Sequence, residues 1–249
     1  MPRFFIDSSQ ICDNRISFVG DDAHHIARSL RMAVGDEITA CCNNGTEYTC
    51  EIESFLDDTK VIAKIIVQKK SDTEPKYYIR LFQALPKGDK LDTVIQKAVE
   101  CGASEIFLFQ SERCVVKIKK DTEERKNERR QKIAESAAKQ CGRGIIPKVN
   151  EPVDYRQMLE LATQSDISLF CYEGEGTVPI GKVISSGLNN ENIRSISVII
   201  GSEGGFSDAE VTSAKEKGMT LVGLGKRILR TETASSFALT CISCITELM

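Results

Sequence analysis

Alternating polar and apolar residues dominate the first part of the chain and predict β-strands. Strands are expected at 37–42, 47–53 and 60–67, and one short helix at 22–30. Asn43-Asn44-Gly45 lies between the first two strands and predicts a hairpin, since Asn and Gly tolerate the positive φ of a tight turn. We therefore predict a small β-barrel over residues 1–72, and the polar stretch 69–75, which ends in proline, reads as a linker.

After Pro75 the pattern changes to apolar strands that alternate with amphipathic helices. Strands are expected at 77–85, 105–109, 167–172, 196–200 and 220–224, and helices at 91–99, 123–140, 154–162, 207–218 and 233–248. Ser207 and Glu210 have the spacing of a capping box, which marks a helix start. This alternation predicts a mostly parallel α/β domain over residues 75–249.

Composition places the chain among ordinary globular proteins, with 249 residues, 41% apolar and 28% charged. No apolar run approaches the ~18 residues of a membrane helix, and the start lacks a signal peptide, so we expect a cytoplasmic protein without a membrane partner. Most of the ten cysteines lie in apolar runs and are expected to be buried free thiols. Cys241 and Cys244 form a C-x-x-C without a second pair at zinc-finger spacing, so we expect no metal.

Charge is distributed unevenly although the net charge is only −3. Residues 113–148 hold twelve Lys/Arg and five Asp/Glu, a local charge of +7, whereas residues 1–72 carry −4. Such clustering favours a phosphate-contacting patch, although a charge run is commonly just a solvated face. The candidates for phosphate contacts in this segment are Arg113, Lys117, Arg129, Arg130 and Arg143.

Glycine-rich segments follow three of the predicted strands, at 172–176, 201–206 and 223–234. Ligands of α/β sheets collect beyond the carboxyl ends of the strands, and glycine lets the backbone approach a ligand closely. Each segment taken singly is explained equally well as a tight turn. Three of them at one sheet edge predict a ligand site.

Several other chemistries find no support in the sequence. Residues 176–183 nearly match a phosphate-binding loop, but Val183 stands where a hydroxyl should hold Mg²⁺. His24 and His25 are the only histidines and are adjacent. On a helix they point in different directions, so they cannot easily both bind one metal ion. The G-x-S-x-G elbow and a G-x-G-x-x-G after the first strand are both absent, which argues against serine hydrolases and Rossmann enzymes.

Five segments together resemble the RsmE-type ribosomal RNA methyltransferases of the SPOUT superfamily over nearly the full length. They are Pro2-Arg3-Phe4-Phe5, the helix 24–31, the basic segment 128–147, and the pair formed by 201–206 and 224–234. Gly201-Ser202-Glu203-Gly204-Gly205-Phe206 is similar to that family's G-P-E-G-G-F motif. Ser202 departs from it, because the family usually has proline there. The change loosens φ but removes no hydrogen-bond donor.

The resemblance implies a SPOUT α/β domain with a C-terminal trefoil knot, preceded by a PUA-like β-barrel, in a homodimer. It also implies S-adenosylmethionine as cofactor and methylation of N3 of a uridine in 16S rRNA, within a small-subunit particle. The implied cofactor residues are Glu173, Ile200, Gly201, Glu203, Gly204, Gly205, Leu224, Gly225, Ile228, Leu229 and Thr233. Implied RNA contacts in the PUA-like part are Arg3, His25, Arg28 and Arg31.

Uracil N3 carries a proton at neutral pH, so methylation needs a proton acceptor or cations that stabilise the developing anion. The candidates are Arg230, Glu232 and Arg227. Two plainer roles stay open: Glu232 as a helix N-terminal carboxylate, and Arg227 as an ion-pair partner of Glu203. Two rival functions also stay open, a methyltransferase acting on a ribose 2′-hydroxyl and an RNA-binding assembly factor without catalysis.

Overall fold

The computed structural model describes residues 1–57, 59–118 and 120–248. The chain forms two compact units, one of residues 1–74 and 138–146, the other of 75–137 and 147–249. The last residues of helix α3 (Lys120–Cys141) and the segment after it thus belong to the first unit. A linear reading of the sequence had placed this segment with the second part of the chain.

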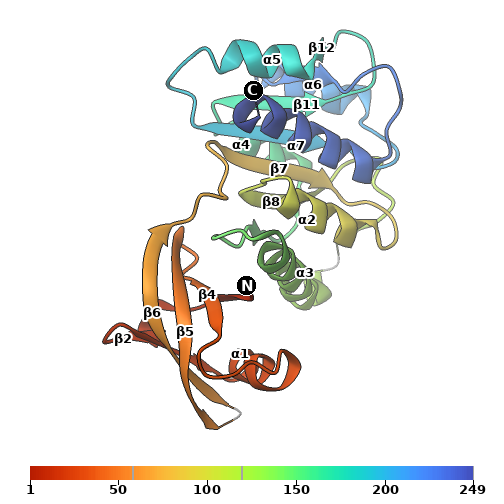
Figure 1. The fold of residues 1–249 in the computed structure, drawn as a ribbon. Coiled ribbons are helices and arrows are strands. Elements are labelled where there is room, and N and C mark those ends of the chain that lie inside the picture. The colour runs from red at the N-terminus through yellow and green to blue at the C-terminus, as the bar shows by residue number, and fades with distance from the viewer. Residues whose placement is uncertain (58, 119, 249) are drawn as a thin grey trace. The chain divides into compact units, whose positions relative to one another are not determined.

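The first unit contains one six-stranded sheet in the order β1-β4-β5-β6-β3-β2 (Figure 1). Its strands are β1 (Arg3–Phe5), β2 (Ile11–Cys12), β3 (Arg15–Val19), β4 (Glu37–Cys41), β5 (Thr46–Asp57) and β6 (Lys60–Lys70), with a 3₁₀ turn η1 (Ser8–Gln10). The predicted hairpin is confirmed, with positive φ at Asn43 (53°) and Gly45 (83°). The linker prediction was wrong for Lys69 and Lys70, because both residues pair with β5 in the antiparallel ladder.

The predicted short helix of the first unit is confirmed but is not regular. Helix α1 (Asp21–His24) continues as the π-helical segment η2 (His25–Ser29), whose geometry is rare and often marks a functional site. Arg31, just beyond it, has a φ of 52°, a left-handed conformation that costs a non-glycine residue about 1 kcal/mol. The core between helix and sheet includes Phe4, Phe18 and Ile26, all at most 2% exposed.

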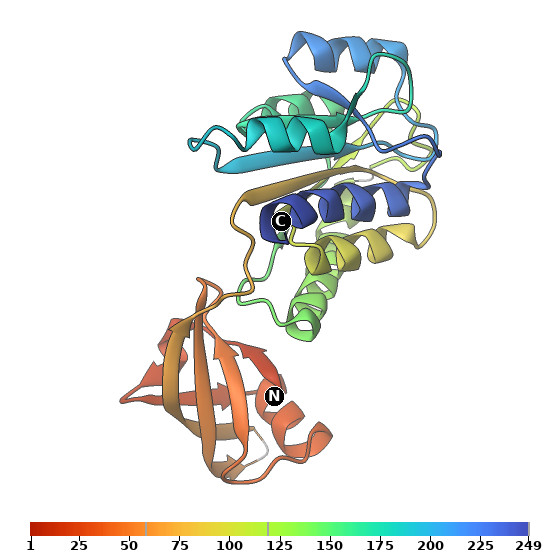
Figure 2. The ribbon, with the colours of Figure 1, turned by 45° about the horizontal axis from the view of Figure 1, so that its top comes forward.

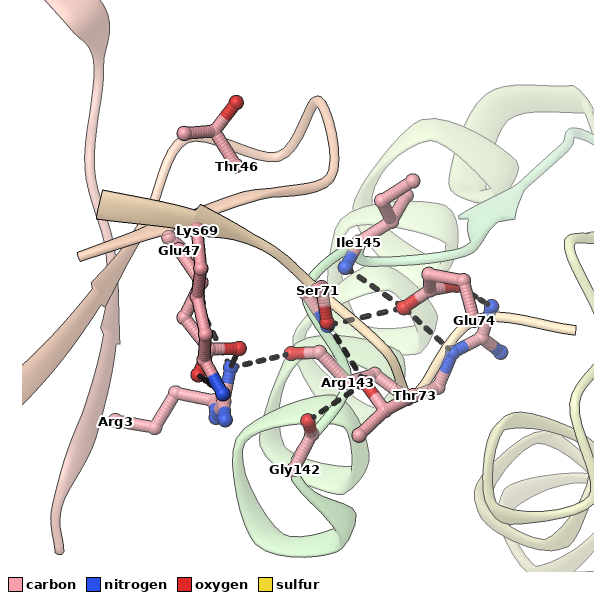
Figure 3. Close-up of polar contacts among 12 residues, drawn as sticks. Arg3, Thr46, Glu47, Lys69, Ser71, Thr73, Glu74, Gly142, Arg143 and Ile145 are labelled. Carbon is pink, nitrogen blue, oxygen red and sulfur yellow. Dashed lines mark hydrogen bonds and ion pairs between the residues drawn. The ribbon is translucent and has the colours of Figure 1, made fainter. Parts of the chain in front are cut away.

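A carboxylate holds the 138–146 segment to the rest of the first unit (Figure 3). Glu74 accepts hydrogen bonds from the Arg143 guanidinium (2.6 Å) and from the backbone N–H groups of Gly144 (2.9 Å) and Ile145 (3.1 Å). The Thr73 hydroxyl also donates to the Gly142 carbonyl (3.0 Å). The end of α3 and its exit are therefore fixed by side chains of Thr73 and Glu74, which follow β6.

The second unit is built on a parallel sheet in the order β10-β8-β7-β13-β11-β14-β12, with β9 beside β8. Its strands are β7 (Tyr78–Ala84), β8 (Glu105–Gln110), β9 (Lys148–Val149), β10 (Val153–Asp154), β11 (Ile167–Cys171), β12 (Val178–Pro179), β13 (Ser195–Ile200) and β14 (Thr220–Gly223). Every residue of β13 except the first is buried, as expected for a central strand covered on both faces. The predicted parallel α/β architecture is confirmed.

Helices α2 (Lys90–Glu100), α4 (Tyr155–Ala162), α5 (Ile180–Gly187), α6 (Asp208–Glu216) and α7 (Thr231–Glu247) complete this unit. Figure 2 shows α2 (olive) and α7 (dark blue) side by side, in agreement with their contacts. The predicted capping box of Ser207 and Glu210 is confirmed. Helix α7 begins two residues earlier than predicted, because the Arg230 carbonyl accepts from Thr233 and Ala234 N–H. Within the described residues, each helix is too short or too polar to span a bilayer.

Candidate functional site

A cavity of about 590 Å³ lies in the second unit at the carboxyl ends of neighbouring parallel strands. Its walls are the loops after β11, β13 and β14, which are the three glycine-rich segments. Lys90 and Arg113, from the segments after β7 and β8, line it as well. Because the strands are parallel, these loops all emerge at one edge of the sheet, where ligands of α/β folds bind.

Nine of the eleven cofactor residues implied by the resemblance line this cavity. They are Glu173, Ile200, Gly201, Glu203, Gly205, Leu224, Gly225, Ile228 and Leu229. Gly204 and Thr233 are not among the lining residues that the structure describes. A Cβ on Gly204 would lie 3.0 Å from the Arg113 Cβ, so this glycine permits the close packing of two loops. Thr233 is exposed in the first turn of α7.

Two glycines of the cavity wall, Gly201 and Gly225, occupy positions that a residue with a Cβ would not fit well. A Cβ on Gly201 would lie 3.0 Å from the Phe206 ring, which itself packs on Phe170 with centroids 4.2 Å apart. Gly225 has a φ of 108°, a conformation that residues with a Cβ rarely adopt, and no atom lies within 4 Å of its Cβ direction. Gly201 therefore lets Phe206 pack closely against the loop, and only the backbone at Gly225 is left open to a ligand.

A buried glutamine ties the loops of the cavity together, and the sequence analysis missed it. Gln83, 0% exposed at the end of β7, donates through Nε2 to the Thr231 hydroxyl (2.9 Å). Thr231 in turn donates to the Gly201 carbonyl (2.6 Å), so the start of α7 is joined to the end of β13. A lone glutamine in the apolar run of β7 was the available signal, because a buried amide needs partners.

The charged side chains of the cavity are partly paired. Glu203 accepts from Lys90 Nζ (2.6 Å) and the Lys87 backbone N–H (3.2 Å), rather than from Arg227 as one reading of the sequence allowed. Burial alone would raise the pKa of Glu203, but the hydrogen bonds from Lys90 and the Lys87 backbone hold it below its usual value. Arg227 and Arg230 line the cavity and are exposed.

Glu232, the third catalytic candidate, does not line the cavity. It lies in the first turn of α7, where a carboxylate is favoured by the helix dipole. Its Oε2 atom is buried without a hydrogen-bond partner among the described residues. A buried carboxylate oxygen of this kind is costly unless a proton or a donor reaches it.

Three of the arginines predicted to contact RNA instead form ion pairs with carboxylates of the protein itself. Arg3 pairs with Glu47 (2.8 Å) and Arg143 with Glu74 (2.6 Å), both in the first unit (Figure 3). Arg130 pairs with Glu123 (2.9 Å) within α3, with both side chains about nine-tenths buried. Each guanidinium neutralises a largely buried carboxylate, which a linear count of charge cannot show.

The remaining predicted RNA contacts lie at the surface. His25, Arg28 and Arg31 are exposed in and after the π-helical segment of the first unit. Arg113, Lys117 and Arg129 are exposed in the second unit, where Arg129 forms an ion pair with Asp92. These six residues, called the exposed RNA candidates below, are divided between the two units.

Comparisons with known proteins place the chain in a family. A model of the RNA methyltransferase domain matches residues 73–243, and a model of the RNA methyltransferase PUA domain matches residues 20–66. Ribosomal RNA small subunit methyltransferase E of Bacillus subtilis (strain 168) is 37% identical over 255 residues, covering 100% of this chain and 98% of its own length. The chain belongs to the ribosomal RNA small subunit methyltransferase E family.

Solved structures of similar proteins agree with this membership. Ribosomal RNA small subunit methyltransferase E from Neisseria gonorrhoeae, bound to S-adenosylmethionine, has a TM-score of 0.84 and 29% identity, covering 98% of both chains. A putative methyltransferase from Legionella pneumophila, in complex with the same cofactor, has a TM-score of 0.82 and 28% identity, covering 97% of this chain and 96% of its own. The resemblance stated from the motifs is thus confirmed at the level of the family.

The cavity also distinguishes between the two interpretations of the glycine-rich segments. They form one cavity instead of three unrelated turns. The near-match to a phosphate loop spans the turn before β12 and the start of α5, and only Thr177 of it lines the cavity. All ten cysteines are free thiols as expected, but only four are buried, Cys41, Cys50, Cys114 and Cys171; four others are partly exposed, and Cys12 and Cys244 are exposed. Burial raises the pKa of the Cys50 thiol to about 12, so this thiol stays protonated at neutral pH.

Proposed function

We propose that this chain is an S-adenosylmethionine-dependent methyltransferase that acts on N3 of a uridine in 16S ribosomal RNA. The observation that carries the proposal is the cavity at the ends of β11, β13 and β14, which is bounded by glycine loops and bordered by Arg227 and Arg230. Its volume of about 590 Å³ falls within the ~300–1,000 Å³ range of ligand pockets. Relatives with the same fold bind this cofactor.

The residues present fit the cofactor. Gly225 leaves its backbone accessible, and the hydroxyl of Ser202, a lining residue, is buried without a partner among the described residues. Leu224, Ile228 and Leu229 offer apolar contacts along the loop after β14. When bound, S-adenosylmethionine supplies an already activated methyl group, so the chain's task is to prepare the nucleophile.

Deprotonation of uracil N3 is the step that the chain must assist. The anion that forms is spread over N3 and its flanking carbonyls, and planar guanidinium groups hydrogen-bond to such oxygens well. Arg230 and Arg227 border the cavity and are assigned this role. Glu232, in the first turn of α7, stays a candidate acceptor of the N3 proton because its Oε2 has no partner among the described residues, although it does not line the cavity. Uracil N3 lies on the pairing edge, so the base must be unpaired or flipped out.

Several finer assignments belong to the same proposal. We infer that the first unit is a PUA-like barrel that contacts RNA, divided from the methyltransferase domain near residues 72–75. We also infer a trefoil knot at the C-terminus, a homodimer, and a small-subunit particle as substrate. The bonds that join Thr231 to Gly201 and Gln83 support the knot, since they draw the segment after β14 back past β11 to β13.

Cofactor binding is tested at Gly201. Gly201→Ala introduces a Cβ 3.0 Å from the Phe206 ring, which cannot retreat because Phe170 lies behind it. Such overpacking costs about 1–3 kcal/mol, so we expect affinity for S-adenosylmethionine to fall by roughly 5- to 150-fold in calorimetry. Gly181→Ala is the matched control, because its Cβ would make an ordinary 3.8 Å contact with Ile245 in α7. Equal affinities of the two variants would contradict the assignment.

RNA binding by the first unit is tested at Arg31. Arg31→Gly removes the strain of a φ of 52° and should raise stability by about 1 kcal/mol. It should also lower the slope of log affinity for 16S RNA against log salt by roughly 0.7–0.9, the value of one phosphate contact. Asp13→Gly relieves a similar φ of 47° and should leave the slope unchanged. A gain in stability with an unaltered slope would show that Arg31 does not touch phosphate.

The reaction itself is tested by mass spectrometry of nucleosides from 16S ribosomal RNA incubated with the protein and S-adenosylmethionine. We expect N3-methyluridine. A 2′-O-methylated nucleoside would instead support the ribose-directed rival. Absence of cofactor binding in calorimetry would support the assembly factor without catalysis.

A further inference from the structure

A buried carboxylate beside the cavity, Glu210 in the first turn of α6, has no role in the reaction described above. The residue is 6% exposed and both carboxylate oxygens are used. Oε2 accepts from the Ser207 backbone N–H (2.9 Å), as the capping box requires. Oε1 accepts from the backbone N–H of Glu112 (2.8 Å), which lies 98 residues away in sequence. A capping box alone does not explain that second bond.

The second bond joins the two loops on either side of the cavity rim. Ser207 ends the loop after β13, and Glu112 belongs to the turn after β8. The Ser207 hydroxyl also donates to the Glu112 carboxylate (2.6 Å), so the link is doubled. The turn is stiffened locally by the Cys114 backbone N–H, which donates to the Ser111 carbonyl (3.1 Å). Its position relative to the 201–207 loop is therefore set by Glu210 and Ser207.

Arg113 is the residue that this arrangement presents to the cavity. It follows Glu112, lines the cavity and is exposed. Its Nη1 donates to the Gly204 carbonyl (3.2 Å), where the absence of a Cβ lets the two loops approach. A guanidinium has five donors, and this is the single hydrogen bond that the described residues give it. Because Arg113 lines the cavity and is exposed, its other donors are accessible to a ligand at this edge.

We propose that Arg113 binds a phosphate of the substrate strand at the rim of the cavity, and that Glu210 is the positioning residue that holds Arg113 and the cofactor loop in register. The proposal rests on the RNA methyltransferase function proposed above. Phosphate is the ligand because an exposed arginine with free donors, at the edge of a cavity that takes a base, matches the bidentate geometry of a phosphodiester. The Glu210 carboxylate thus positions both the loop after β13, which lines the cofactor cavity, and Arg113.

Glu210→Gln is the sharpest test, because the side chain keeps its shape while one oxygen becomes an N–H₂ donor. That donor must face the N–H of either Ser207 or Glu112, and one of the two loops is released. We expect affinity for S-adenosylmethionine in calorimetry to fall roughly tenfold, the scale of one lost charge-assisted hydrogen bond. We also expect the salt slope of binding to transcribed 16S ribosomal RNA to fall by nearly one, as for Arg113→Ala.

The controls separate positioning from general destabilisation. Glu216→Gln changes an exposed carboxylate of the same helix and should leave both quantities unchanged. The double variant Arg113→Ala/Glu210→Gln should show the slope of Arg113→Ala alone, since a lost contact cannot be lost twice. A double variant whose loss of salt slope equals the sum of the two single losses would overturn the proposal. A Glu210→Gln variant that behaves like Glu216→Gln would overturn it as well.

A second variant and the behaviour of the wild-type protein separate this inference from the proposed function. If Glu210→Gln does not fold, Glu112→Gln replaces it, because this variant weakens only the bond from the Ser207 hydroxyl. Glu112→Gln should lower the cofactor affinity and the salt slope by less than Glu210→Gln does. No change in either quantity would overturn the proposal. A wild-type protein that binds no S-adenosylmethionine would refute the proposed function. A wild-type protein that binds it, with variants that behave alike, would refute this inference alone.

Discussion

Arg230→Ala is expected to lower the single-turnover rate of methyl transfer by a factor on the order of 10²–10³, the loss seen when one oxyanion-type donor is removed. The fold should survive, because Arg230 stabilises the start of α7 through its backbone carbonyl, which accepts from Thr233 (2.9 Å) and Ala234 (2.8 Å). Alanine keeps both bonds. The exposed side chain is free to serve the substrate.

The effect should appear in kcat, with unchanged affinity for S-adenosylmethionine, because the contact strengthens as N3 loses its proton. Arg230→Lys should restore little of the lost rate of methyl transfer, since an ammonium group lacks the planar pair of donors that two carbonyl oxygens require. A variant that keeps its single-turnover rate but loses RNA affinity would make Arg230 a phosphate contact. Arg227 and Glu232 would then become the better catalytic candidates.

Glu74→Ala is expected to destabilise the protein by about 3–5 kcal/mol, a large share of the ~5–15 kcal/mol that holds a typical domain folded. The substitution leaves the Arg143 side chain, 5% exposed, without its anionic partner. It also strands the N–H groups of Gly144 and Ile145, which donate to the same carboxylate (Figure 3). Urea unfolding followed by circular dichroism measures the loss.

Glu53→Ala is the matched control for that substitution. Glu53 pairs with Arg15 at 2.6 Å, but both side chains are 40% exposed or more, and such surface pairs contribute at most about 1 kcal/mol. Similar losses for the two variants would mean that burial does not decide the strength of the Glu74 pair.

The sheet elements of both units were predictable because their pattern is local. A strand buried on both faces, such as β13, must be apolar along its length, and a hairpin turn such as Asn43-Asn44-Gly45 must tolerate positive φ. The cavity was predictable for a related reason. Parallel strands bring their carboxyl ends to one edge, so glycine-rich segments after several strands meet there whatever the details of packing.

The roles of the charged residues were not predictable, because they depend on partners far away in sequence. Arg130 and Arg143 look alike in a basic segment, yet each neutralises a buried or half-buried carboxylate. Glu210 has the spacing of an ordinary capping box, and its bond to Glu112 exists only once β8 and β13 lie in the same sheet. A charge in a linear sequence carries no information about whether folding will desolvate it.

The sequence by itself determined the family, the alternation of strands and helices, and the loops that form the cavity, since these follow from periodicity and from motifs read within short windows. Tertiary structure alone decided that residues 138–146 belong with the first unit, that Gln83 joins β7 to α7, and which arginines stay exposed at the surface. The physical reason is that burial and hydrogen bonding are properties of pairs. Their energies depend on distances in space that separation along the chain does not encode.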